Sequence, residues 1–365
     1  MRSPLLAVIS PDRRYERGPF LARSPLRDLG RLRFAFPALR QGLYQWLGHV
    51  PPGRVLMPDY VPEGVYGPFE RRGWQVAFYP LLPSLEIDTG ALRRAGPADI
   101  AVLIHQFGLY IQHNVDAVRE ASAGKGLVLE DFAHTLWDSR TVLSGDLCGF
   151  SFTKSLGVAD GSLLWLRNRS LLHPCTCTAD TAGDRRLKTL LGRRLLVEHL
   201  LATICRRRTC HGPLLRATRR WCDYYSHLSA AYTGLAGPIS PASLRTLDHL
   251  DMDRVSTARR ALADRYVERL NPALMFDLPR DSFLRQSLFA FPVRVPDRES
   301  FVQHMSRHGV RTTVLTDRWW WRNDAPPGDT YRSHCLLPLT HYLSVEQVDR
   351  VIDAANQWLR VSVSP

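Results

Sequence analysis

Two stretches of the chain decide the expected fold: GLVLEDFAH at residues 126–134 and GFSFTKSLGVADGS at residues 149–162. Each starts as a short apolar run and ends in polar residues, a pattern typical of a strand buried on both faces and followed by a turn. Further apolar runs lie at Val55–Met57, Val76–Leu82, Ile100–Ile104 and Leu163–Leu166. Helical stretches separate several of these runs. We therefore expect an α/β fold with a mostly parallel sheet flanked by helices.

The pattern changes in the last third of the chain. From Asp253 onward, long helical stretches alternate with two strand-like segments, FAFPVRV at 289–295 and CLLPL at 335–339. This mixture is typical of an α+β unit. We predict a large α/β domain over residues 1–245 and a smaller α+β domain over residues 246–365.

Composition excludes several classes of protein. Of the 365 residues, 45% are hydrophobic and 23% are charged, which is the composition of a globular chain rather than a disordered one. No apolar run is long enough to cross a membrane, and the stretch Leu5–Ile9 is too short for a secretory signal. Seven cysteines, an odd number, make a disulfide framework improbable. These features favour a cytoplasmic protein.

The net charge of +13 is concentrated in one segment. Residues 185–220 hold eleven Lys or Arg against the single acid Glu198, with leucines at helical spacing between them. This predicts an amphipathic basic helix, which could be a solvated helix covering the large domain, a contact with an anionic membrane, or a surface that attracts a phosphate-bearing substrate. Binding to nucleic acid is the least favoured interpretation, because no recognition motif accompanies the charge.

Two groups of cysteine and histidine are candidate metal sites. They are HPCTC at 173–177 and CRRRTCH at 205–211. Neither has the two-residue gap of a zinc knuckle, and three arginines interrupt the second group. The sequence therefore predicts no metal site.

Chemically active side chains gather where three of the expected strands end. These groups are His105 and Gln106, then Glu130, Asp131 and His134, then Ser151 and Lys154. Because open α/β sheets bind ligands outside the carboxyl ends of their strands, these groups could converge on one site. A lysine beside an aspartate and a serine is what pyridoxal phosphate requires: an amine for covalent attachment, a carboxylate for the pyridine nitrogen, and donors for the phosphate.

Each of these residues alone has an ordinary structural interpretation. Asp131 would be a helix cap or an ion-pair partner, His134 a structural histidine and Lys154 a surface charge. Their joint arrangement favours the chemical interpretation, since the chain has only three lysines. The expected helix at Pro37–Leu47 adds a candidate anion site, because its amino terminus would aim free N–H groups beyond the sheet edge.

In order and spacing, these motifs resemble those of the DegT/StrS family of sugar aminotransferases, which are fold-type I pyridoxal-phosphate enzymes. The resemblance runs from about Arg33 to Leu359. The segments that carry it are PPGRVLMPDY, HQFG, VLEDFAH, GFSFTKSLGVADGS, ARRALADRYVERL and CLLPLTHYLSVEQVDRVIDA.

The resemblance implies a fold-type I architecture, pyridoxal 5'-phosphate as cofactor, and a homodimer. It implies that Lys154 is the Schiff-base lysine, that Asp131 faces the pyridine nitrogen, that His134 lies by the ring hydroxyl and that Ser151 contacts the phosphate.

Two departures from the family pattern involve the remaining cofactor contacts. The turn before the first helix is Phe34-Ala35-Phe36-Pro37, which offers Ala35 and Phe36 where the family has a small glycine-bearing turn. Pro62 stands near the place of the aromatic residue that stacks on the cofactor, so Tyr60 or Tyr66 is expected to substitute.

Three functions stay open from the sequence. The first is transfer of an amino group, with glutamate as the implied donor, to a keto sugar that is nucleotide-linked and belongs to a secondary-metabolite or surface-polysaccharide pathway. The second is other pyridoxal-phosphate chemistry on the same fold. The third is a non-catalytic binding or regulatory protein. The run Trp319-Trp320-Trp321 could line a substrate pocket or form a packed wedge between domains.

Overall fold

A central sheet organises the molecule. The computed structural model describes residues 33–122, 126–158, 160–171, 238–314 and 333–362, together with Thr189 and the strand at 319–320. Within these residues, seven strands form one sheet in the order β1-β9-β8-β6-β5-β2-β4. The strands are β1 (Arg33–Phe36), β2 (Arg54–Pro58), β4 (Gln75–Tyr79), β5 (Ile100–Ile104), β6 (Leu127–Phe132), β8 (Leu147–Ser151) and β9 (Ser162–Leu166).

The pairing of these strands confirms the predicted mostly parallel sheet. Strands β8, β6, β5, β2 and β4 run parallel to one another. Strands β9 and β1 add an antiparallel edge. The sequence predicts a turn at residues 34–37; residues 34–36 belong to β1 instead, because they pair with β9.

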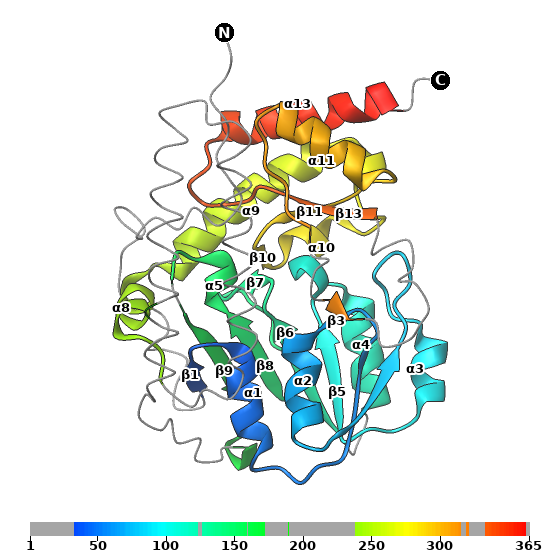
Figure 1. The fold of residues 1–365 in the computed structure, drawn as a ribbon, viewed down its shortest axis with the longest axis vertical. Coiled ribbons are helices and arrows are strands. Elements are labelled where there is room, and N and C mark those ends of the chain that lie inside the picture. The colour runs from blue at the N-terminus through cyan, green and yellow to red at the C-terminus, as the bar shows by residue number, and fades with distance from the viewer. Residues whose placement is uncertain are drawn as a thin grey trace.

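Helices cover both faces of the sheet, as Figure 1 shows. They are α1 (Leu39–Leu47), α2 (Glu63–Arg71), α3 (Thr89–Ala95) and α4 (Gln112–Ala121). Successive residues of one strand point to opposite faces. In β5, Val102 packs with the core under α1 and α2, whereas Leu103 packs with the core under α3 and α4. Burial on both faces is the reason that these strands read as continuous apolar runs.

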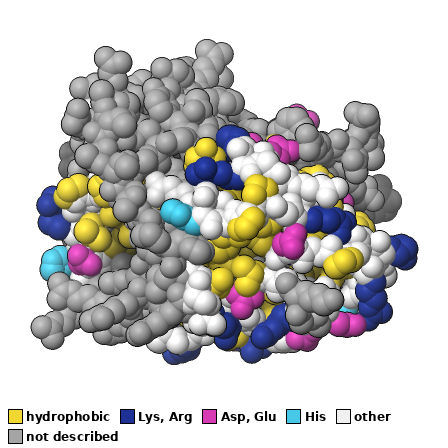
Figure 2. All heavy atoms as spheres, turned by 90° about the horizontal axis from the view of Figure 1, so that it is seen from below, with side chains coloured by type: hydrophobic (Ala, Val, Ile, Leu, Met, Phe, Trp, Pro, Cys, Tyr) yellow, Lys and Arg dark blue, Asp and Glu magenta, His cyan; other side chains and the backbone are white. Residues whose placement is uncertain are grey.

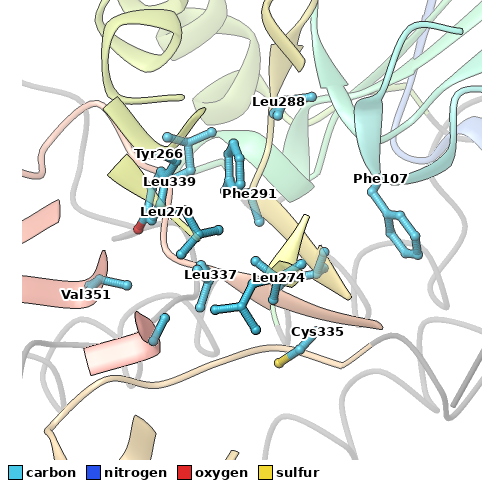
Figure 3. Packing of buried hydrophobic residues seen from close by; sticks show 14 of the residues in the cluster. Phe107, Tyr266, Leu270, Leu274, Leu288, Phe291, Cys335, Leu337, Leu339 and Val351 are labelled. Atoms are coloured by element: carbon cyan, nitrogen blue, oxygen red, sulfur yellow. The ribbon is translucent and has the colours of Figure 1, made fainter. Parts of the chain in front are cut away.

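Most of the C-terminal part lies beyond the carboxyl ends of the parallel strands, whereas its first helix packs with the sheet core (Figure 1). Its elements are α8 (Pro241–His249), α9 (Met252–Arg269), α10 (Arg280–Leu284), β10 (Ser287–Leu288), β11 (Phe291–Arg294), α11 (Arg298–Arg307), β12 (Trp319–Trp320), β13 (His334–Leu337) and α13 (Val345–Ser362). Strands β11 and β13 pair antiparallel. Tyr266, Phe291 and Leu337 pack together in the core of this part, and Phe107 joins that core from the sheet side (Figure 3).

The predicted domain boundary at residue 245 falls inside α8. The change from the sheet core to the C-terminal core comes later along the chain, within α9. Val255 in α9 still packs with the sheet strand β8, whereas Leu262 belongs to the C-terminal core. The division at 245 therefore stays a prediction, with α8 and the first turn of α9 attached to the sheet core.

Several sequence predictions concern residues outside the described ranges. The basic segment 185–220 is outside them except for Thr189, and so are the cysteine and histidine groups at 173–177 and 205–211. On the face seen in Figure 2, the described Lys, Arg, Asp and Glu side chains are scattered rather than gathered into one patch. None of the described helices is both long and apolar enough to cross a membrane.

A tight turn at Phe107 and Gly108 follows β5 and packs on the backbone of His134. Phe107 has a φ of 57°, in the left-handed region, and Gly108 has a φ of 87°. A Cβ at Gly108 would meet the backbone carbonyl of His134. The glycine is therefore required both by its backbone conformation and by the close approach of the turn after β5 to the backbone of His134.

We expect Gly108→Ala to destabilise the protein more than Gly73→Ala. Gly73 also has a positive φ, 77°, but a Cβ there would have no heavy atom within 4 Å. Both variants incur a backbone cost of about 1 kcal/mol, and Gly108→Ala adds an overpacking cost of about 1–3 kcal/mol. Urea unfolding measures the free energy of unfolding of each variant, and the two values are compared if both depend equally on urea concentration. Equal losses in the two variants would show that the approach to His134 carries no energetic weight.

Candidate active site

The carboxyl ends of three adjacent parallel strands bring the candidate groups to one edge of the sheet. Asp131 in β6 stands in register with Ile104 of β5 and with Gly149 of β8. Ser151 ends β8, and the short helix α5 (Phe152–Ser155), which carries Lys154, follows directly.

Lys154 and His134 are in direct contact. The Nζ atom of Lys154 lies 3.0 Å from Nε2 of His134. Desolvation lowers the pKa of Lys154 to about 8, the nearby Asp131 carboxylate opposes this shift, and Arg40 adds to it. Near neutral pH, part of the molecules carry an amine with this pKa in its uncharged form, which is the form that can accept a proton.

His134 is held in its neutral form. Burial lowers its pKa well below the ordinary value, and electrostatic interaction with Lys154 and with His334 lowers it further. Its ring stacks on Phe289 with centroids 4.7 Å apart. Its backbone carbonyl accepts a hydrogen bond from Phe289 N–H at 3.1 Å. The C-terminal part therefore fixes the ring that faces the lysine.

Asp131 is a buried carboxylate with one oriented oxygen. Its side chain is in a residue only 4% exposed, and Oδ1 accepts a hydrogen bond from Ala133 N–H at 2.7 Å. Burial raises its pKa, and the charge of Lys154 acts in the opposite direction. A carboxylate in this environment gains most from a nearby cationic N–H group.

Glu130 and His105 form a support behind the site. Nε2 of His105 lies 3.6 Å from Oε1 of Glu130, and both side chains are buried. Oε2 of Glu130 accepts hydrogen bonds from the N–H groups of Ser144 and Gly145 at 2.8 and 2.9 Å. Burial acts to raise the pKa of Glu130, but these partners outweigh it, and the pKa is lowered. Both residues are thus engaged in holding the strand ends.

Ser151, Ala35 and Phe36 are the next residues predicted to contact the cofactor, and their surroundings differ. The Ser151 hydroxyl is half-buried, 3.3 Å from the Thr153 hydroxyl. Ala35 is exposed, whereas the ring of Phe36 is buried against Gly42 in the core under α1. The carbonyl of Phe36 accepts a hydrogen bond from the Ser162 hydroxyl at 3.1 Å, so this residue is held by the sheet edge.

Tyr60 and Tyr66 point into different cores. Tyr60 is buried between the sheet and the C-terminal part, with its hydroxyl 3.4 Å from Nε2 of His334 and its ring edge-on to Phe107. Tyr66 lies in α2 and packs in the core under α1 and α2. Pro62 belongs to β3 (Val61–Pro62), which pairs with Trp319 of β12. The backbone of the tryptophan run thus joins the C-terminal part to the strand beside the site.

Arg259 is a site residue that sequence reasoning missed. It is 1% exposed, and its guanidinium donates to the carbonyl oxygens of Leu288, Phe289 and Leu339 in the C-terminal part at 3.0, 3.3 and 3.1 Å. It also donates to the carbonyl of Ser155, next to Lys154, at 2.6 Å. A signal existed: Arg259 lies on the apolar stripe of α9, between Val255 and Tyr266. His334 carried no such signal, since its neighbours are far away in sequence.

No group of three or more His, Cys, Asp or Glu side chains placed to hold a metal occurs among the residues that the structure describes. The candidate site therefore consists of one amine, one carboxylate, one neutral imidazole and hydroxyl groups.

Comparison with known proteins identifies the fold. No family model matches the chain, and no curated protein matches it. Solved structures do. The sugar aminotransferase CalS13 from Micromonospora echinospora is 18% identical, with a TM-score of 0.60 over 98% of this chain and 100% of that one. A DegT DnrJ EryC1 StrS aminotransferase from Brucella abortus is 15% identical, with a TM-score of 0.60 over 94% of this chain and 91% of that one.

A third structure adds a ligand state. The PLP-form of the putative sugar aminotransferase Spr1654 from Streptococcus pneumoniae is 14% identical, with a TM-score of 0.62 over 95% of this chain and 94% of that one. These structures confirm the resemblance at the level of the fold, which is that of fold-type I enzymes.

We expect Asp131→Asn to lower the pKa of Lys154 below about 8, because the carboxylate is the group that raises it. Trace acetylation of the cofactor-free protein over a pH series, with mass analysis of the Lys154 peptide, gives the pKa of this amine. Asp116→Asn on the exposed face of α4 is the control and should leave the inflection in place. An unchanged or higher inflection in Asp131→Asn would rule out the electrostatic coupling.

We expect Arg259→Met to cost about 3–5 kcal/mol of folding free energy, since it leaves several buried carbonyl groups without their donor. Arg265→Met on the same helix removes only a solvent-exposed pair with Asp349 and should cost far less. Urea unfolding compares the two variants. Similar losses would mean that the buried contacts of Arg259 contribute no more than a surface ion pair.

Proposed function

We propose that this chain is a pyridoxal-phosphate-dependent aminotransferase that transfers an amino group to a keto sugar. The observation that carries the proposal is the contact between Lys154, with its lowered pKa, and neutral His134, beside the buried carboxylate of Asp131. The similarity of the fold to sugar aminotransferases supports the substrate class.

The side chains at this edge match what the cofactor requires. Lys154 is the amine that carries it covalently, Asp131 faces its pyridine nitrogen, and His134 adjoins its ring hydroxyl. The hydroxyls of Ser151 and Thr153 lie beside the lysine turn, where a phosphate needs donors. When bound, pyridoxal phosphate supplies an electron sink that eases bond breaking at the amino-bearing carbon.

Lys154 is the proton carrier of the proposed reaction. At a pKa of about 8, roughly a tenth of the amine is uncharged at pH 7 and can take a proton from carbon. Neutral His134 accepts a hydrogen bond from the protonated amine at Nε2 and so keeps it directed into the site. Asp131, whose Oδ1 is fixed by Ala133 N–H, would keep a proton on the pyridine nitrogen of the cofactor.

The finer parts of the proposal follow the family pattern. Glutamate is the amino donor, and the keto sugar is nucleotide-linked, in a secondary-metabolite or surface-polysaccharide pathway. The protein acts in the cytoplasm as a homodimer. The basic charge of residues 185–220, rather than the family pattern, supports a peripheral contact with an anionic membrane, beside the alternatives of a solvated helix and a surface that attracts a phosphate-bearing substrate.

The protein loaded with pyridoxal phosphate is expected to be yellow, and borohydride is expected to abolish this absorbance and label the Lys154 peptide. Labelling at Lys125 or Lys188 would refute the assignment.

Glutamate alone should convert the visible spectrum to that of the amine form of the cofactor, and a keto sugar should restore it. A sugar consumed without any response to amino donors would favour other pyridoxal-phosphate chemistry, and no response to either ligand would favour a binding protein.

The Asp131→Asn variant separates binding from chemistry. It is expected to retain the borohydride-sensitive absorbance and to lose at least about a hundredfold in the rate of each half-reaction, because the ring nitrogen loses its anionic partner. Stopped-flow spectra of single half-reactions measure this rate. An unchanged rate would remove Asp131 from the mechanism.

A further inference from the structure

Glu130 is a buried carboxylate that depends on a single side chain for one of its oxygens. The residue is 0% exposed, and its Oε2 atom accepts the N–H groups of Ser144 and Gly145. Oε1 faces Nε2 of His105 at 3.6 Å, and neither of these two buried atoms has another polar partner within hydrogen-bond distance among the residues that the structure describes. The imidazole is therefore the group that compensates this end of the carboxylate.

An ionised carboxylate at this depth requires a neighbouring cation. Burial acts to raise the pKa of Glu130, and the interaction with His105, followed by the two backbone N–H groups, outweighs burial and lowers it. A charge removed from water is costly unless it is paired. A protonated His105 supplies the pairing charge, whereas a neutral ring would supply only a hydrogen bond.

Aromatic rings hold His105 against β6. Its ring stacks on Phe132 with centroids 4.3 Å apart and on Tyr110 with centroids 5.5 Å apart. Burial raises the pKa of Tyr110, so its hydroxyl is neutral near pH 7, and Arg285 of α10 lies over the Tyr110 ring at 4.5 Å. Among the described residues, the negative charges recorded beside the imidazole are those of the two carboxylates in β6.

The backbone places His105 directly beside Asp131. Ile104 of β5 is in register with Asp131, and His105 N–H donates to the Asp131 carbonyl at 3.1 Å. Glu130 and Asp131 are successive residues of one strand, so their side chains project to opposite faces of the sheet. Burial raises the pKa of Asp131 and Lys154 lowers it, and His105 acts in the same direction as Lys154 from the other side of the strand.

Asp131 is held less firmly in its ionised form than Glu130. Oε2 of Glu130 accepts two backbone N–H groups and the thiol of Cys148 at 3.5 Å, whereas Asp131 accepts one backbone N–H, that of Ala133, within the described part of the chain. Lys154 also compensates Asp131, but this amine is uncharged whenever it acts as a base in the proposed reaction. A cation that keeps its proton is therefore needed to keep Asp131 ionised throughout.

We infer that His105 is this permanent cation: paired with Glu130, it stays protonated and keeps Asp131 in its ionised form. His105 is a positioning residue, since it acts through Asp131 from behind the sheet. The inference rests on the proposed function for the use that is made of Asp131. It requires that loss of the His105 charge and loss of the Asp131 carboxylate have the same effect on Lys154.

His105→Gln tests this requirement in the cofactor-free protein, because glutamine keeps a donor for Glu130 and removes the charge. Trace acetylation over a pH series reports the pKa of Lys154, which is about 8 in the wild type. We expect the inflection to fall by at least half of its decrease in Asp131→Asn, because a neutral Asp131 no longer raises this pKa. The double variant His105→Gln with Asp131→Asn should match Asp131→Asn alone.

The direction of the shift decides the outcome. A direct effect of the lost positive charge on Lys154 would move the inflection upward, so an unchanged or higher inflection in His105→Gln would overturn the inference. His113→Gln, at an exposed histidine of α4, is the matched control and should leave the inflection in place. If the inflection falls as expected while Asp131→Asn keeps the wild-type rates of both half-reactions, the charged pair stands and the proposed function fails.

The charge of His105 can also be measured without any substitution. Nitrogen chemical shifts distinguish a protonated imidazole from a neutral one, and the contact with the Phe132 ring assigns the signals of His105. In the cofactor-free wild type we expect both ring nitrogens to carry protons at pH 7. A neutral ring at this pH would overturn the inference, even if His105→Gln does not fold.

Discussion

The guanidinium of Arg259 is the contact on which the geometry of the site depends. It binds the carbonyl of Ser155, directly after Lys154, and the carbonyl of Phe289, whose N–H binds the backbone of His134. The two residues that meet at the centre of the site are thus positioned through one buried side chain. A charge removed from water is costly, and here it is stabilised by carbonyl dipoles from both parts of the chain.

The pKa values of the site residues follow from burial and from the opposite charges of Lys154 and Asp131. Desolvation lowers the pKa of Lys154 and of His134 and raises that of Asp131, so burial alone favours the neutral form of each group. The mutual attraction of Lys154 and Asp131 resists this trend. The amine is therefore close to the balance between its two protonation states, which is the condition that proton transfer near neutral pH requires.

The sequence predicted those features that depend on local pattern. Apolar runs ending in polar groups located the parallel strands, and the rule that ligands bind at their carboxyl ends placed Asp131, His134 and Lys154 together. The pairing of residues 33–36 with β9 was not predictable, since it joins segments about 130 residues apart. The same holds for His334 beside Tyr60 and for the carbonyl groups around Arg259, because such contacts exist only once distant segments have packed.

The C-terminal part meets the sheet through contacts of very different strength. Separating it at Arg259 would leave a buried guanidinium and its carbonyl partners without hydrogen bonds, whereas separating β12 from β3 would break the pairing of only two residues in each strand. The first contact is therefore far more costly to break than the second. Because β3 directly follows Tyr60, the weaker contact adjoins the segment that carries Tyr60, whereas the stronger contact holds the lysine turn.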